Sequence, residues 1–104
     1  MPNLIRPELP QEVEVATGFM GNRAQTEILR QLSLLGSATI GQLQAVMRIS
    51  RPSMNRHLSA LSKAGLVLTD PPEGLRHGKD VTYAVQRARI RELAQGYLSY
   101  VEGT

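Results

Sequence analysis

Apolar residues recur at helical spacing in four segments of this chain, and each segment is bounded by residues that begin or end helices well. The clearest segment is centred on Met54, Leu58 and Leu61, which share one face of a helix. Ser50 supplies an oxygen that can cap the first backbone amides, and Gly65 readily takes the left-handed conformation that ends a helix. The pattern therefore predicts a helix that begins just after Ser50 and ends just before Gly65.

Two further helical patterns precede this helix. The first spans about residues 23 to 35, and Asn22 is its capping residue. The second begins at Thr39, where a Gln three residues later completes a capping box. Because the second helix must end before Ser50, it forms a helix-turn-helix with the helix that follows, and Ile49 is the expected apolar plug between them. The expected apolar faces are Ala24, Ile28, Leu29, Leu32 and Leu35 in the first helix, and Leu43, Val46 and Met47 in the second.

After these helices the hydrophobic period becomes an alternating one. Strands are predicted over residues 66–69 and 81–85, joined by a long loop with prolines and glycines. The last pattern, over residues 86–102, is an amphipathic helix whose apolar stripe packs either across a dimer axis or onto the first helix. We expect a dimer contact, formed by Ile90, Leu93, Tyr97, Leu98 and Val101.

The first 20 residues contain three prolines and no sustained period, which predicts an extended arm that can end in a short helix over residues 11–20. Their apolar residues indicate that part of the arm packs on the domain or on a second subunit. The predicted fold class is mainly α with a small β-hairpin, in the order of a winged helix-turn-helix. The organisation is an N-terminal arm (1–20), a winged helix-turn-helix domain (21–85) and a C-terminal dimerisation helix (86–104).

Composition limits the classes of protein to which the chain can belong. A chain of 104 residues forms one domain and is too short for two independent hydrophobic cores. Its 4% aromatic content, with no Trp, predicts a core of Leu, Ile, Val, Met and Ala. The absence of Cys excludes disulfides, thiolate metal sites and Cys nucleophiles. We expect a cytoplasmic protein without a membrane partner, because there is neither a secretory signal nor an apolar run of roughly 20 residues.

Positive charge is concentrated around the helix that follows Ser50. The net charge is +3, but residues 1–21 contain one Arg and three Glu and are net −2, which leaves +5 for the remainder. A basic field of this kind indicates a polyanion partner, and the alternative is an ordinary solvated helix face. Between Glu27 and Asp70 there is no acidic residue, whereas the interval contains Arg30, Arg48, Arg51, Arg56 and Lys63.

Four stretches of the chain carry a family resemblance that covers about residues 20 to 85: GNRA at 21–24 with Ile28-Leu29, ISRPSMNRHL at 49–58, Leu61 with AGLV at 64–67, and RHGK at 76–79 leading to Tyr83. Together they resemble the ArsR-like winged-helix repressors, with the MarR-like group as second choice. The resemblance implies a homodimer that binds a palindromic operator in double-stranded DNA and, commonly, release of the DNA by a metal ion or another signal. The chain lacks the Cys of the metal-sensing members and their His and carboxylate clusters, so it indicates no metal, cofactor or particular effector.

In this fold the helix after Ser50 enters the major groove, which is about 12 Å wide. Asn can bind an adenine edge and Arg a guanine edge. Two of the candidates have alternatives, Ser53 as a support of the helix start and Arg56 as a phosphate contact. The expected base-reading residues are Arg51, Ser53, Asn55 and Arg56, and the expected contacts to the DNA backbone are Thr39, Gln42, Arg48, His57, Lys63, Arg76, His77 and Lys79.

Several other ionisable residues have more than one interpretation. His57 is expected to be a partly buried hydrogen-bonding residue or a phosphate contact rather than a metal ligand. Cations at the start of the last helix are unfavourable to its dipole, so they indicate a bound anion, an acidic partner or ordinary solvation, which we prefer. These cations are Arg87, Arg89 and Arg91. A metal site built from carboxylates alone is an alternative for Glu8, Glu12 or Glu14.

The sequence predicts a sequence-specific DNA-binding transcriptional regulator, expected to be a repressor, that acts as a homodimer through recognition helix 51–64 and wing 70–80. No phosphate-cradling loop, metal triad or nucleophile–base pair is present, so we expect no enzyme activity. The alternatives are a winged-helix protein-interaction module and a phage or plasmid architectural accessory factor. The repressor differs from these in requiring a palindromic site with half-sites about one helical turn, roughly 34 Å, apart.

Overall fold

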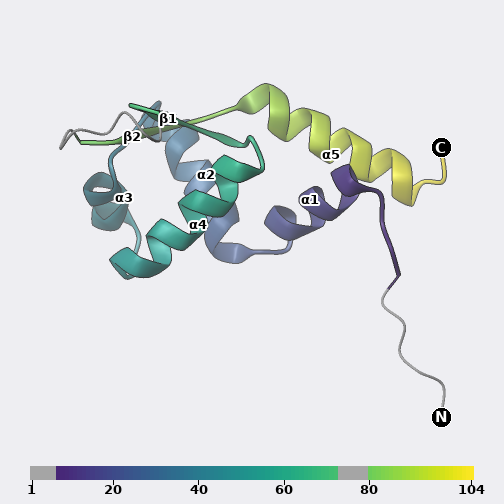
Figure 1. Ribbon diagram of the computed structural model, residues 1–104, viewed down its shortest axis with the longest axis horizontal. Helices are drawn as coiled ribbons and strands as arrows, with labels where there is room; N and C mark the ends of the chain where they lie inside the picture. Colours follow the sequence, from purple (N-terminus) through teal and green to yellow (C-terminus); the bar gives the residue numbers. More distant parts are fainter. Residues whose placement is uncertain (1–6, 73–79) are drawn as a thin grey trace, which may run out of the picture.

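The helices and strands follow one another in the predicted order. The computed structural model describes residues 7–72 and 80–104. Helices α2, α3 and α4 form one group with the hairpin at its edge, and α5 runs away from this group beside α1 (Figure 1). The elements are α1 (Gln11–Met20), α2 (Arg23–Leu35), α3 (Ile40–Val46), α4 (Arg51–Lys63), β1 (Val67–Asp70), β2 (Thr82–Val85) and α5 (Arg87–Val101).

Three of the helices begin at the capping residues that the sequence predicts. Asn22 and Ser50 each accept a hydrogen bond from a backbone amide in the first turn of α2 and α4. At α3 the capping box is complete: the Gln42 amide donates to the Thr39 hydroxyl at 3.2 Å, and the Thr39 amide donates to the Gln42 side chain at 2.8 Å. The helix-turn-helix of α3 and α4 is therefore fixed by local side-chain chemistry at both helix starts.

The two strands pair antiparallel in one short hairpin, with Val67 opposite Val85. The first predicted strand lay one residue early at both ends, because β1 leaves out Leu66 and includes Asp70. The second began one residue early, because Val81 precedes β2. Leu66 follows Gly65, whose φ of 78° reverses the chain after α4. Its amide donates to Leu61 and its carbonyl accepts from Gln86, so the backbone of Leu66 joins the end of α4 to the start of α5.

A single core connects every element. It is made almost entirely of aliphatic residues, as the composition predicts, and only Phe19 and Tyr83 contribute aromatic rings. Tyr83 of β2 also pairs with Ala38, so the link between α2 and α3 lies against the hairpin. The buried residues of this connected core are Ala16, Phe19, Ile28, Leu29, Leu32, Ala38, Leu43, Met47, Met54, Leu58, Leu61, Leu66, Val67, Tyr83 and Leu93.

Two residues expected on apolar faces are exposed instead. Val46 leaves 52% of its surface open, because a helix as short as α3 turns only one side to the core, and Leu43 and Met47 occupy that side. Leu35 is exposed because it is the last residue of α2, where Gly36 directs the chain away at a φ of 84°. Both expectations were wrong at helix ends, where periodicity no longer defines a face.

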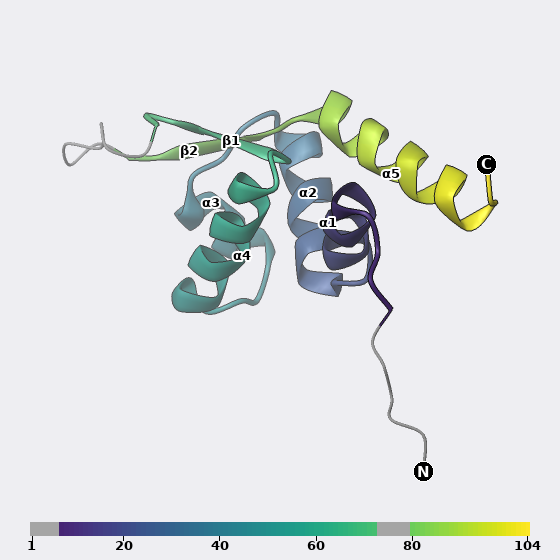
Figure 2. The same cartoon turned by 45° about the vertical axis from the view of Figure 1, so that its right-hand side comes forward.

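The N-terminal segment contributes to the core rather than remaining a solvated arm. The short helix that was one possibility for residues 11–20 is present as α1, and it buries Val13, Ala16 and Phe19. Helix α1 packs against both α5 and α2, and the view in Figure 2 shows α1 beside α2 below the start of α5. The sequence left open whether these apolar residues pack on the domain or on a second subunit. In the structure they pack on the same chain.

Two leucines of α2 allow a matched test of this core. Leu32 is completely buried, whereas Leu34 leaves 66% of its surface exposed. We expect Leu32→Ala to lower the free energy of unfolding by about 2–5 kcal/mol, because it removes apolar contacts and leaves a cavity. Leu34→Ala should change it by less than about 0.5 kcal/mol. Urea unfolding followed by circular dichroism measures both values, and equal losses would contradict the placement of α2.

Candidate nucleic-acid interface

Helix α4 buries one face and presents the other to solvent. Its apolar residues point into the core, so Arg51 and Asn55, four positions apart, lie together on the exposed face. Arg56 is exposed next to them, whereas Ser53 is half-buried. Three of the four candidate base-reading residues are thus accessible to a partner.

Ser53 and Arg56 interact with each other. The Arg56 guanidinium donates from Nη2 to the Ser53 hydroxyl at 3.0 Å, and the Ser53 backbone amide donates to the Ser50 cap. The cap thus uses the Ser53 backbone amide, whereas the Ser53 side chain is engaged with Arg56. Its hydroxyl also holds the Arg56 guanidinium close to the helix surface.

A polar hollow lies where α3, α4 and β2 meet. Arg51 and Asn55 of α4 line it together with Thr39 at the start of α3 and Tyr83 of β2. The structure also places Asp80 in this hollow, a residue that sequence reasoning missed, because no local pattern brings residue 80 next to α4. The hollow combines hydrogen-bond donors and acceptors from three elements on one surface.

Four of the residues expected to contact the DNA backbone lie at or near the ends of α3 and α4. Arg48 and Lys63 are exposed before and at the end of α4. Thr39 and Gln42 bond to each other in the capping box, yet the Thr hydroxyl and the Gln amide nitrogen each keep a donor for an incoming anion. Arg76, His77 and Lys79 lie outside the described residues.

His57 points toward α2 rather than entirely into solvent. Its ring is half-buried, and Nδ1 lies 3.4 Å from the side-chain nitrogen of Gln25. A ring that accepts from Gln25 at Nδ1 carries its proton on Nε2, which leaves one donor for a phosphate. The described residues contain no group of three or more His, Asp or Glu that could hold a metal ion.

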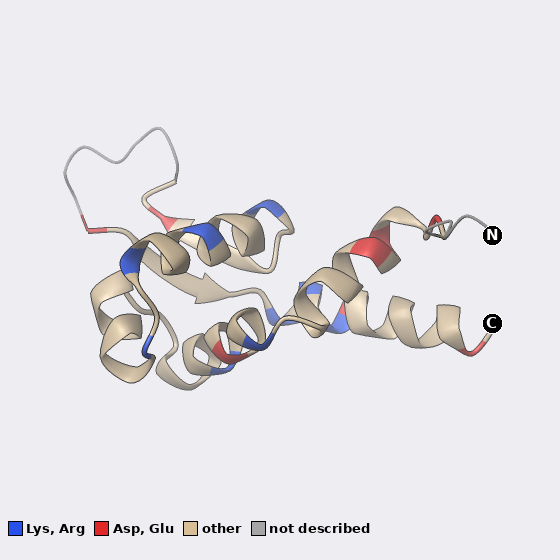
Figure 3. Ribbon diagram, turned by 90° about the horizontal axis from the view of Figure 1, so that it is seen from below, with Lys and Arg blue, Asp and Glu red and all other residues tan. Residues whose placement is uncertain are grey.

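Charge separates the two ends of the molecule. Helix α4 carries only basic ionisable groups and His57, whereas the acidic residues of α1 lie at the far end (Figure 3). Along the sequence, the first acidic residues after α4 are Asp70, Glu73 and Asp80. The exposed face of α4 is therefore suited to a polyanion.

The candidate dimer residues on α5 divide into two groups. Leu93 is only 1% exposed, and Ile90 and Tyr97 are partly buried against the core of this chain. Leu98 and Val101 remain exposed, and Tyr100, which the sequence analysis did not select, is exposed with them. The apolar surface that α5 offers to another molecule is its C-terminal half.

The arginines at the start of α5 are not all ordinarily solvated, contrary to expectation. Arg87 donates from Nη2 to the carbonyl of Ser33 at 3.0 Å, and Arg89 donates from Nε to the carbonyl of Ala64 at 3.3 Å. Arg91 is exposed and makes no hydrogen bond or ion pair with the described residues.

Arg89 has an acidic partner, which was one of the alternatives. Its two Nη atoms bond to the two carboxylate oxygens of Glu12 at 2.6 and 3.0 Å, and Nη1 also contacts Glu92. The hydrogen bond from Arg89 lowers the pKa of Glu12 below its ordinary value of 4.5, and the bond to Glu12 raises the pKa of Arg89. Glu12 is thereby engaged in an ion pair between α1 and α5.

Comparison with known proteins agrees with this geometry. A model of the MarR family matches residues 22–72, which run from the cap of α2 to just after β1. No curated protein matches the chain by sequence. Within the described residues, no helix combines the length and the hydropathy needed to cross a lipid bilayer.

Solved structures share the fold. An ArsR family transcriptional regulator is similar with a TM-score of 0.71 and 18% identity, over 94% of both chains. The transcriptional repressor BigR from Xylella fastidiosa gives a TM-score of 0.61 and 18% identity over 84% of both chains. A mutant MarR from E. coli, crystallised with operator DNA, gives a TM-score of 0.58 and 16% identity over 82% of this chain and 64% of that chain. At these identities the likeness establishes a winged-helix fold.

The ion pair between α1 and α5 makes a pH-dependent contribution to stability. A carboxyl whose pKa is lowered by folding stabilises the protein above its unfolded pKa, and this stabilisation is lost as the pH falls through the lowered value. We expect Glu12→Gln to show a smaller fall in Tm between pH 7 and pH 3 than the unchanged protein. Glu14→Gln, on the same helix but without an arginine partner, should keep the full fall. Equal behaviour of the two variants in thermal melts would rule out the Glu12–Arg89 ion pair.

Proposed function

We propose that this chain, a DNA-binding winged-helix transcriptional regulator of the MarR and ArsR type, acts as a homodimer that binds a palindromic operator and represses transcription. The observation that carries the proposal is the exposed face of α4, where Arg51 and Asn55 lie next to the start of α3 with no acidic residue on either helix. A repressor needs a surface of this kind to compete for promoter DNA.

In this proposal α4 lies in the major groove and reads base edges. Asn55 can donate to and accept from an adenine, and Arg51 can donate twice to a guanine. Each such pair contributes about 1–3 kcal/mol of discrimination against the wrong base. Arg56, held near the helix surface by Ser53, is better placed for a phosphate than for a base.

Backbone contacts position the domain without selecting a sequence. Arg48 and Lys63 lie at opposite ends of α4 and can each neutralise a phosphate along the groove. The donors that remain on Thr39 and Gln42 can bind a further phosphate oxygen beside α3. Arg76, His77 and Lys79 are assigned the same role from the sequence alone.

The dimer contact is assigned to the exposed C-terminal half of α5. Leu98 and Val101 form a small apolar surface there, and Tyr97 is half-buried beside them. Burying these side chains against a second copy would remove apolar surface from water. A two-fold axis through this contact would present two recognition helices to successive turns of one DNA face.

The first experiment separates base reading from backbone contact. Asn55→Ala should reduce discrimination at one base pair by about 1–3 kcal/mol and leave non-specific affinity unchanged. Arg48→Ala should weaken binding to all sequences alike and lower the slope of log K against log salt by about one unit. Fluorescence anisotropy with matched and mismatched duplexes at several salt concentrations gives both values. If neither substitution changes DNA affinity, the DNA interface is not on α4.

The operator itself is identified by selecting bound duplexes from a random pool at moderate salt. Recovery of a palindrome with half-sites about 10 base pairs apart, centre to centre, or a multiple of this, supports a symmetric dimer. Recovery of unrelated sequences at low affinity would instead indicate an architectural factor. No recovery even at low salt would indicate a protein-interaction module.

A substitution on α5 tests the dimer contact. Leu98→Asp places a charge in the proposed interface, so we expect a monomer whose operator affinity is lower because the two half-sites are no longer bound together. The control is Leu34→Asp, which adds the same charge at an exposed position at the end of α2. Sedimentation velocity distinguishes the two species, and a Leu98→Asp protein that remains dimeric would place the interface elsewhere.

A further inference from the structure

The first turn of α5 binds the ends of two other helices through its arginines. Arg87 donates to the carbonyl of Ser33 in the last turn of α2, and Arg89 donates to the carbonyl of Ala64 at the end of α4. Carbonyls at helix ends lack intrahelical partners and carry the negative end of the dipole. Arg87 and Arg89 are unfavourable to the dipole of α5, because they lie at its N-terminus, but they stabilise the C-terminal ends of α2 and α4.

Arg89 makes the larger number of contacts. Its guanidinium also forms the bidentate pair with Glu12 of α1 and contacts Glu92 of its own helix. Gly65 lies beside it: a Cβ at that position would be 3.7 Å from Arg89 Nε. One side chain thus connects the end of the recognition helix, the N-terminal helix and the helix assigned to the dimer.

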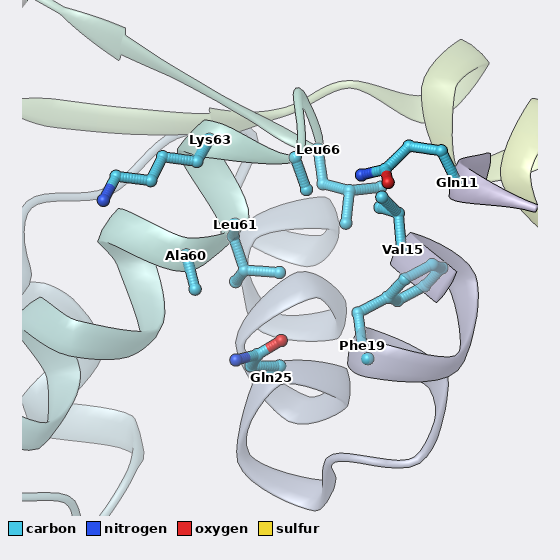
Figure 4. Close-up of a pocket in the computed structure, with 10 residues that line it drawn as sticks. Gln11, Val15, Phe19, Gln25, Ala60, Leu61, Lys63 and Leu66 are labelled. Carbon is cyan, nitrogen blue, oxygen red and sulfur yellow. The ribbon is translucent and has the colours of Figure 1, made fainter. Parts of the chain in front are cut away.

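Direct packing between α1 and α4 is interrupted by a hollow. It is lined by Val15 and Phe19 from α1 and by Ala60 from α4, with Leu66 at its upper edge (Figure 4). Lys63 is also at the rim, but its ammonium points away from the hollow in this view. Because apolar packing does not fill this space, the bonds of Arg89 to Glu12 and Ala64 form a direct polar link between α1 and the end of α4.

We infer that Arg89, held by Glu12, is a positioning residue that fixes the angle between α4 and α5 and thereby sets the half-site spacing that the homodimer accepts. This inference rests on the proposed function. The covalent link between hairpin and α5 is only Gln86, so the angle is set by the contacts around it. Arg89 touches no DNA in this role and acts through the backbone of Ala64.

The physical consequence follows from the geometry of DNA. Inserting two base pairs between half-sites moves one of them by about 7 Å and rotates it by about 70°. A rigid dimer cannot bind both half-sites after such a change. A dimer in which the angle between α4 and α5 can vary can still bind both of them, although less well. Loosening should therefore reduce the preference for one spacing without changing how α4 reads a single half-site.

The test measures affinity for duplexes that differ only in spacing. The duplexes carry the selected palindrome at its recovered spacing, the same palindrome with two base pairs inserted or removed, and one isolated half-site. The variants are Arg89→Gln and Glu12→Gln, the second of which keeps Arg89 and its bond to Ala64. Arg91→Gln is the matched control, because it removes the same charge from the same turn of α5 at an exposed position that makes no hydrogen bond or ion pair with the described residues.

We expect the unchanged protein and Arg91→Gln to prefer the recovered spacing by about tenfold or more, the loss expected when one half-site contact of about 1.4 kcal/mol is missing. Arg89→Gln should lower the ratio of affinities for the recovered and the altered spacing to about threefold or less, while its affinity for an isolated half-site changes less than about twofold. The ratio for Glu12→Gln should lie between those of the unchanged protein and Arg89→Gln. A merely destabilised protein would bind all duplexes less well in the same ratio. If Arg89→Gln does not fold, Glu12→Gln alone decides the result.

If the folded variants kept the spacing preference of the unchanged protein, the inference would be overturned, but the proposed function would be unaffected. Failure of the unchanged protein to bind any selected palindrome would instead remove the proposed function. The two failures are distinguished because the second is already seen with the unchanged protein, whereas the first requires that the unchanged protein binds and prefers one spacing.

Discussion

The burial of one face of α4 is the constraint on which the rest of the structure depends. Met54, Leu58 and Leu61 are nearly inaccessible to solvent, and they fix the rotation of this helix about its own axis. With that rotation set, Arg51 and Asn55 must face outward. The hydrophobic core therefore decides which polar residues of α4 are presented to the proposed DNA partner, and no separate interaction is needed to orient them.

The same core connects the recognition surface to the rest of the chain. Leu66 continues the chain from α4 into the hairpin, and its carbonyl accepts from Gln86 at the start of α5. Arg87 and Arg89 then bind the ends of α2 and α4, so α5 begins in a network of contacts to both. An orientation set in the core is in this way transmitted to the exposed end of α5, some distance from the DNA surface.

The sequence predicted most of the helix starts because capping is local chemistry. The Asn22, Thr39 and Ser50 caps act within three residues along the chain, so each can be recognised without a tertiary structure. The predicted burial of Val46 and Leu35 was wrong, because both are the last residues of their helices, where fewer neighbouring residues cover the apolar face. The strand ends were shifted by one residue, because Leu66 serves as a connection rather than as a paired strand residue.

By itself the sequence determined the order of elements, helix α4 and the polar residues that this helix exposes, since these depend on spacing along one segment. Only the tertiary structure decided contacts between distant segments. It placed Asp80 and Arg51 around one hollow, joined Glu12 to Arg89 across 77 positions, and covered Leu93 inside the chain. Such pairings depend on how whole helices pack together. That packing results from many weak contacts between distant segments, which cannot be recognised from a local sequence pattern.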